Sequence, residues 1–130
     1  MSAGKYSFTI EQGATLQFEI QYKDSNNTPV DLTSYNGRLQ VRPTVGSSDV
    51  YLTLSSTLQS DNTGLNFSGS NGSTPLSSGS IGIYVSAVTS STLDFTTAHY
   101  DLEIYSGSGN SEYVVRLLEG KVKLSKEVTR

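Results

Sequence analysis

The stretch from Gly13 to Lys23 reads GATLQFEIQYK and carries the clearest structural pattern in the sequence. From Leu16 onward its apolar side chains occupy every second position and alternate with polar ones. Side chains of a β-strand point alternately to its two faces, so this period of two predicts a strand with one buried and one solvated face. Gln12 and Gly13 are expected to form a bend or bulge after an earlier alternating segment.

The same period recurs along most of the chain. We expect further strands at residues 6–11, 35–42, 50–55, 65–67, 81–85, 100–105 and 112–124. In the last of these the parity changes between Leu117 and Gly120, which predicts a β-bulge. Between residues 86 and 95 the alternation stops, and the apolar positions indicate a single helical turn. Residues 68–80 are rich in Gly and Ser, which favours a mobile loop.

Composition leaves two classes of structure open. The 130 residues include 22 Ser, 14 Thr and 12 Gly, which fits either a disordered polar chain or an all-β domain. The 8 Tyr and 4 Phe fall inside alternating runs, which favours the β domain. We therefore predict an all-β fold, an immunoglobulin-like two-sheet β-sandwich of about seven or eight strands, with a small barrel as the alternative.

One domain of this kind should span residues 1–130, with short polar segments at 1–5 and 125–130. Its core is predicted from the inward positions of the alternating runs. These positions are Leu16, Phe18, Ile20, Leu39, Val41, Leu52, Ile83, Leu102, Ile104 and Val122.

The residue inventory argues against an enzyme. Cysteine is absent, which excludes thiolate chemistry, and the single histidine, His99, has no second histidine with which to bind a metal. His99 lies close to Asp101, but because adjacent strand residues point to opposite faces we expect no catalytic pair there. The oxygen-rich stretches at 24–27 and 61–64 lack the complete calcium-loop pattern and are expected to be turns. We predict no catalytic residue, no metal and no cofactor.

Charge and hydropathy argue against two kinds of partner, nucleic acids and membranes. A net charge of −3 with only 16% charged residues argues against a nucleic-acid surface. The apolar runs are far shorter than the roughly 20 residues that span a bilayer, so no membrane partner is expected. The polar start, Met1 to Lys5, gives no indication of a secretory signal.

An ordered set of motifs resembles a family of small virion structural proteins of tailed bacteriophages. Gly13-Ala14-Thr15 opens a strand, and Pro29-Val30-Asp31-Leu32-Thr33-Ser34-Tyr35 leads into Arg38-Leu39-Gln40-Val41-Arg42. Tyr100-Asp101-Leu102-Glu103 and Leu118-Glu119-Gly120-Lys121-Val122 follow. The layout is also similar to immunoglobulin-like N-terminal domains of phage baseplate upper proteins. Ser34 departs from the family's usual glycine, which makes a left-handed conformation there less favourable.

The resemblance implies a non-enzymatic tail or baseplate adaptor that is made in the host cytoplasm and binds other virion proteins. It also implies that the protein is homo-oligomeric or present in several copies in the particle. A host-recognition or carbohydrate-binding module and a capsid decoration protein are the alternatives. Outward arginines and tyrosines and the C-terminal segment are predicted to make the contacts, because Arg and Tyr are enriched where interfaces carry their binding energy. The predicted contact residues are Arg38, Arg42, Tyr51, Tyr84, Tyr105, Lys126, Glu127, Val128, Thr129 and Arg130. In the competing interpretation the arginines pair with surface carboxylates such as Glu19 and contribute little.

Overall fold

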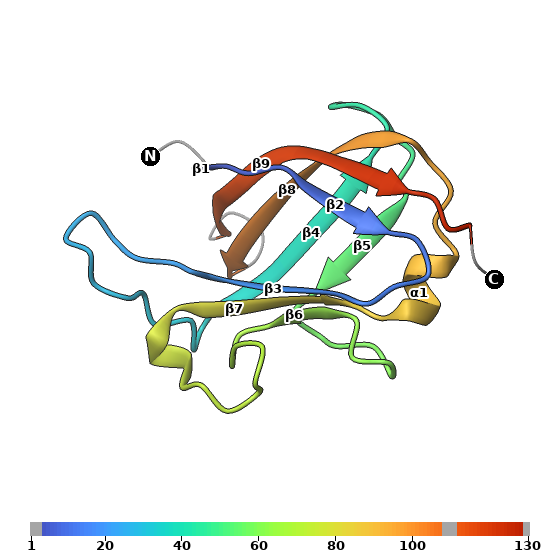
Figure 1. Cartoon of the computed structure of the whole chain (residues 1–130). Helices are drawn as coiled ribbons and strands as arrows, with labels where there is room; N and C mark the ends of the chain where they lie inside the picture. Colours follow the sequence, from blue (N-terminus) through green and yellow to red (C-terminus); the bar gives the residue numbers. More distant parts are fainter. Residues whose placement is uncertain (1–3, 108–111, 129–130) are drawn as a thin grey trace.

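The computed structural model describes residues 4–107 and 112–128, and these form two β-sheets packed face to face. Figure 1 shows the two layers, with the short helix α1 (Ala87–Ser91) at one end. The prediction of an all-β sandwich is confirmed, and the alternative of a closed barrel is wrong because the strands separate into a six-stranded and a three-stranded sheet. The described strands number nine rather than seven or eight.

The large sheet contains six strands in the order β1-β9-β8-β4-β5, with β2 also pairing with β9. Their bounds are β1 Gly4–Lys5, β2 Phe8–Glu11, β4 Asn36–Arg42, β5 Leu52–Ser55, β8 Thr97–Ser106 and β9 Tyr113–Ser125. Both β1 and β2 run parallel to β9, whereas the other neighbours are antiparallel. The polar segments expected at 1–5 and 125–130 are therefore shorter, because Gly4 and Lys5 form β1 and Ser125 ends β9.

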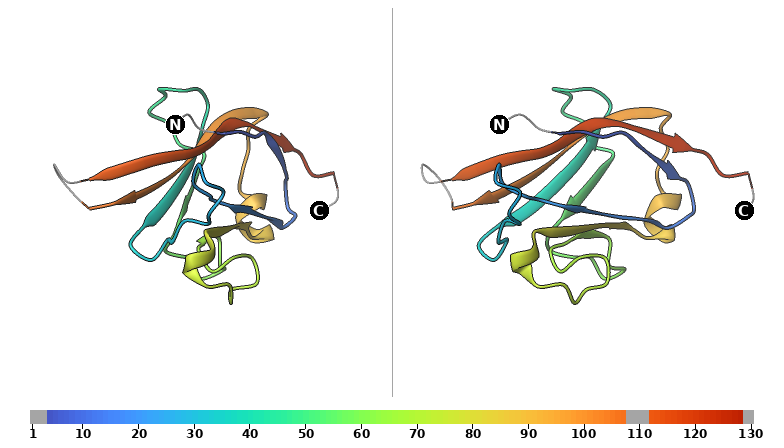
Figure 2. Two further views of the ribbon diagram at one scale, coloured as in Figure 1. Left: turned by 90° about the vertical axis from the view of Figure 1, so that its left-hand side faces the viewer. Right: turned by 60° about the vertical axis from the view of Figure 1, so that its left-hand side comes forward.

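The small sheet has the order β3-β7-β6, with β3 at Leu16–Gln21, β7 at Ser80–Val85 and β6 at Gly64–Asn66. Figure 2 shows it as a separate layer below the large sheet. The order β9-β8-β4-β5 matches G-F-C-C′ of a variable-type immunoglobulin sandwich, and β3-β7-β6 matches B-E-D. The chain changes sheets at the turn around Gly13, which takes a φ of +84° between β2 and β3.

Seven of the predicted core side chains are buried between the sheets. They are Leu39, Val41, Leu52, Ile83, Leu102, Ile104 and Val122. The prediction is wrong for Leu16, Phe18 and Ile20, which are only half-buried. The reason is that β3 is an edge strand, which among the described strands pairs with β7 alone, so its inward side chains are covered on one side only.

Aromatic rings cover that open side of the sandwich. The Phe18 ring lies 5.2 Å from the ring of Phe8 and 5.6 Å from that of Tyr6. The hydroxyl of buried Tyr100 donates a hydrogen bond to the Tyr6 carbonyl at 2.6 Å. Burial, and then the nearby Tyr6, raise the pKa of Tyr100 to about 12. Together these contacts join the link between β1 and β2 to β8 of the large sheet and to β3 of the small sheet.

The link between β1 and β2 runs alongside β9 and passes close to Gly120. A Cβ atom on Gly120 would lie 2.1 Å from the Tyr6 carbonyl oxygen, so only glycine allows this approach. The predicted β-bulge in β9 is confirmed, and it lies just before Gly120. Leu102 pairs with Leu118 while Glu103 pairs with Arg116, which leaves Leu117 as the extra residue.

The predicted helical turn is confirmed as α1, whose N-terminus is held by hydroxyls. The Ser86 hydroxyl accepts from the Thr89 backbone N–H, and the Asp61 carboxylate accepts from the hydroxyls of Ser86 and Thr89. Asp61 also accepts from the backbone N–H of Thr63. These hydrogen bonds, first from Ser86 and then from Thr89, hold the pKa of Asp61 far below its usual range. They tie the β5–β6 connection to α1.

Candidate protein interface on the large sheet

Most charged side chains of the strands in the large sheet point to the outer face of that sheet. Because residues two apart on a strand share a face, β4 and β8 each present a row of polar side chains outward. We call this surface the charged face. Its members used below are Arg38, Gln40, Arg42, His99, Asp101, Glu103, Tyr105, Arg116 and Glu119.

Arg38 is held in place on this face by two neighbours. Its Nε donates to Glu103 Oε1 at 2.9 Å, and the guanidinium lies 4.4 Å from the centroid of the Tyr105 ring. The hydrogen bond that Arg38 donates to Glu103 raises the pKa of the guanidinium above its usual value. The arginine does pair with a carboxylate, as the competing interpretation expected. Its partner is not Glu19, however, because Glu19 lies on the other sheet and accepts from the Ser70 backbone N–H.

Arg42 lies four residues further along β4 and is positioned without a carboxylate. Its two terminal nitrogens donate to the Ser47 carbonyl at 2.6 Å and to Gln40 Oε1 at 2.8 Å. It lines a hollow of about 300 Å³ together with His99, Asp101 and Arg116. The hydrogen bonds of this guanidinium go to neutral acceptors, and the nearby carboxylate, Asp101, acts on it through charge alone.

The carboxylates and cations of this face form a chain of ion pairs towards β1. Arg116 lies 3.5 Å from Asp101 and 3.8 Å from Glu119, and Glu119 also accepts from Lys5. Burial in the hollow, followed by the charge of Glu103, raises the pKa of Asp101. The pairs are exposed enough to be worth little in stability, but they restrict the directions in which the side chains point.

His99 and Asp101 correct one sequence-based argument. These residues are two apart on β8 rather than adjacent, so they share the outer face and line the same hollow. Within the described residues, no group of three or more His, Cys, Asp or Glu side chains could hold a metal ion. The local pattern of the sequence does not reveal that His99 and Arg116 line the same hollow as Arg42, because the pairing of β4, β8 and β9 brings them together.

The predicted contact residues fall in three places rather than one. Arg38, Arg42 and Tyr105 share the charged face, whereas Tyr84 lies on the outer face of the small sheet. The other predicted contact residues that the structure describes lie near α1 and the connection that follows it. Here the Tyr51 ring stacks on Phe95 at 4.7 Å, Lys126 donates to Asp94, and the Glu127 backbone N–H donates to Gln12.

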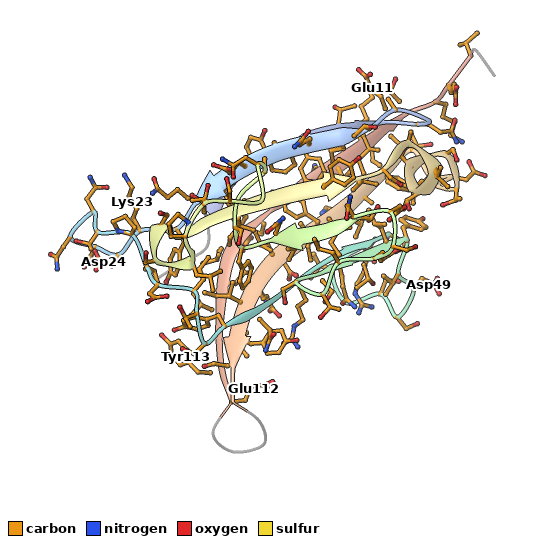
Figure 3. All side chains as sticks on the ribbon, turned by 90° about the horizontal axis from the view of Figure 1, so that it is seen from below. Glu11, Lys23, Asp24, Asp49, Glu112 and Tyr113 are labelled. Carbon is orange, nitrogen blue, oxygen red and sulfur yellow. The ribbon has the colours of Figure 1, made fainter. Side chains whose placement is uncertain are left out.

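The C-terminal segment continues past this end. Val128 is 97% exposed, and Thr129 and Arg130 lie outside the described residues. At the opposite end, β9 begins at Tyr113, with Glu112 just before it (Figure 3). The structure therefore brings together the arginines of β4 with Tyr105, and it separates them from Tyr84.

A scan against known protein families and a search of curated proteins both find no match to this chain. Among residues 4–107 and 112–128, no helix is long and apolar enough to cross a membrane.

Proposed function

We propose that this chain is a non-enzymatic structural protein of a tailed-phage virion, a tail or baseplate adaptor that binds neighbouring virion proteins through its charged face. The observation that carries the proposal is the arrangement around Arg38, in which a partly exposed guanidinium is fixed by Glu103 and by the Tyr105 ring. The motif resemblance of the sequence supplies the virion context.

Physical reasoning supports an interface at this place. Arg and Tyr are the side chains that most often dominate binding energy at protein interfaces. Ordering a long side chain on binding costs about 0.5–1.5 kcal/mol, and a side chain that is already fixed in the free protein avoids much of that cost. Arg38 and Arg42 are both held by hydrogen bonds before any partner arrives.

The mixed charge of the face also fits a protein partner better than a nucleic acid. Asp101, Glu103 and Glu119 are interleaved with Arg38, Arg42 and Arg116, so the face presents alternating signs rather than a uniform positive field. Such a pattern selects a partner with complementary charges and rejects others. A phosphate backbone would meet three carboxylates.

The test replaces Arg38 and Arg42 together with alanine and measures incorporation into particles alongside the melting temperature. We expect incorporation to fall severalfold with a nearly unchanged melting temperature, because both side chains lie on the surface. Lys23→Ala is the matched control. It removes a cation from the turn that projects beyond β3 (Figure 3), away from the charged face, and should be incorporated normally.

A separate deletion of residues 126–130 tests the C-terminal segment. Normal incorporation of both the double variant and the deletion would contradict the proposal. Because Lys126 and Glu127 contact Asp94 and Gln12, the deletion is interpreted only together with its melting temperature.

A further inference from the structure

A second hollow lies on the opposite side of the molecule, over the outer face of the small sheet. It has a volume of about 290 Å³, close to the lower end of the range for small-molecule sites. Side chains of β3, β6 and β7 form its floor, and the connections on either side of β6 form its walls. None of the proposed contacts of the charged face takes part in it.

A glycine in the floor of the hollow allows one wall to lie close against the sheet. Gly82 lies in the middle of β7, and a Cβ atom there would lie 2.8 Å from the Ser70 backbone nitrogen and 2.9 Å from the Gly69 carbonyl carbon. The loop after β6 can therefore rest directly on the sheet. Glu19 of β3 fastens it, because its Oε1 accepts from the Ser70 N–H at 2.7 Å.

The lining of this hollow contains no Lys, Arg, His, Asp or Glu. It contains instead four side-chain amides, from Gln17, Asn62, Asn66 and Asn71, and one phenol, Tyr84. An amide offers a paired donor and acceptor without charge. A lining of this kind suits a neutral ligand with many hydrogen-bonding groups. It gives an anion no counter-charge, and the nearby Glu19 carboxylate is already engaged by the Ser70 N–H.

Two of the amides are already oriented. Asn66 Oδ1 accepts from the Ser68 N–H at 2.8 Å, and Asn71 Oδ1 accepts from Ser73 and Thr74. Their oxygens are thus engaged, and among the described residues no hydrogen bond is made by either Nδ2 group. The donors of Asn66 and Asn71 are fixed in direction and available to a ligand.

Tyr84 supplies an aromatic surface beside these donors. Its strand neighbours are Gln17 on β3 and Gly64 on β6, and the glycine carries no side chain to cover the ring on that side. Tyrosine pairs an apolar face with a polar tip. A pyranose ring has the matching character, since its hydroxyls lie around the rim and its C–H groups on the face.

We propose that this hollow, the amide pocket, binds a neutral saccharide. Lined by Gln17, Asn62, Asn66, Asn71 and Tyr84, it offers donors, acceptors and a stacking ring to one sugar unit. A peptide is the less suitable ligand, because extended peptides usually add to a sheet edge, whereas this hollow lies on a sheet face beneath a loop.

The test is an NMR titration of the full-length chain with the methyl glycosides of glucose, galactose, N-acetylglucosamine and rhamnose. We expect at least one of them to shift the side-chain amide signals of Asn66 and Asn71. Asn66→Asp and Asn71→Asp keep the oxygen that caps the loop but remove the Nδ2 donor, so each should weaken binding about tenfold. Asn26→Asp makes the same change in a distant turn and should have no effect.

Two results would overturn the proposal. One is the absence of any shift at Asn66 and Asn71 with all four glycosides in a protein that melts normally. The other is a response to N-methylacetamide that no glycoside reproduces, which would identify a peptide group as the ligand. Since the amide pocket and the charged face lie on different sheets, failure here leaves the virion interface untouched, and the Arg38 and Arg42 variants should bind the glycoside normally.

Discussion

The two outer faces of the sandwich are built by different means. On the charged face, side chains of β4, β8 and β9 contact one another across the sheet, as in the ion pairs Arg38–Glu103 and Arg116–Asp101. On the small sheet, the protein's own loop covers β7, and backbone atoms of Gly69 and Ser70 press against Gly82. Substitutions on the charged face should therefore affect the stability of the fold little. The outer face of the small sheet is packed against the protein's own loop, so substitutions at that contact should affect stability more.

The largest effect should come from filling the space at Gly82. In Gly82→Ala the new Cβ would meet backbone atoms rather than a flexible side chain, so the loop has to move. We expect a loss of about 1–3 kcal/mol in the free energy of unfolding, the usual cost of overpacking. Chemical denaturation measures it. Thr53→Ala on the exposed side of β5 is the control, and an equal loss in both variants would remove the distinction between the two faces.

A smaller, pH-dependent effect should come from Asp61, which anchors the connection that leads into β6. Hydrogen bonds depress its pKa in the folded protein below the ordinary 3.8. Its contribution to stability is therefore fully present above 3.8 and is lost as the pH falls from there through the lower pKa of the folded state. Unfolding in this acidic range then takes up a proton. Asp61→Asn should flatten the fall in stability between pH 4 and lower values.

Denaturation curves measured at several acidic pH values test this expectation. Asp49→Asn on an exposed turn provides the comparison, because within the described part of the chain the Asp49 carboxylate accepts no hydrogen bond and only its backbone N–H is engaged, by the Ser47 hydroxyl. An acid dependence that is identical in the Asp61 variant and the parent protein would show that the network does not anchor this connection.

The smallest effect on stability is expected at Arg38. Its ion pair with Glu103 is partly solvated, and such pairs contribute about 0–1 kcal/mol. Arg38→Ala should change the melting temperature by no more than a few degrees, in thermal scans at low and at physiological salt. A loss as large as that of Gly82→Ala would show that the charged face is also required for folding.

The sequence predicts the strands well where one face is buried and the other is solvated. The runs at Leu39–Val41 and Leu102–Ile104 show clean alternation, and both lie in the centre of the large sheet. The bulge near Leu117 is also visible, because an extra residue shifts the parity of the apolar positions. In these segments the burial pattern and the strand pairing agree, so the local pattern is enough.

Edge position and loop geometry were not predictable in this way. The alternation of β3 is as regular as that of β4, yet Phe18 is only half-buried because no second described strand flanks β3. The loop expected at 68–80 contains a 3₁₀ turn at Leu76–Ser78 and a hydrogen bond to Glu19, and its mobility stays a prediction. The amide pocket depends on contacts between segments about 50 residues apart, which composition does not reveal.

The parallel pairing of β1 and β2 with β9 has a consequence for how the chain folds. Lys5 and Glu119 are in contact although they are 114 positions apart, so this pairing closes one of the longest loops in the molecule. Closing such a loop carries a large entropic cost, and β-sandwiches with distant contacts fold in milliseconds to seconds. Among the described strands, the segment around Phe8 pairs with β9 alone, so during synthesis this pairing has to wait until β9 has left the ribosome. Until then the Phe8 ring lacks the fixed position in which it packs against Phe18 and Tyr100.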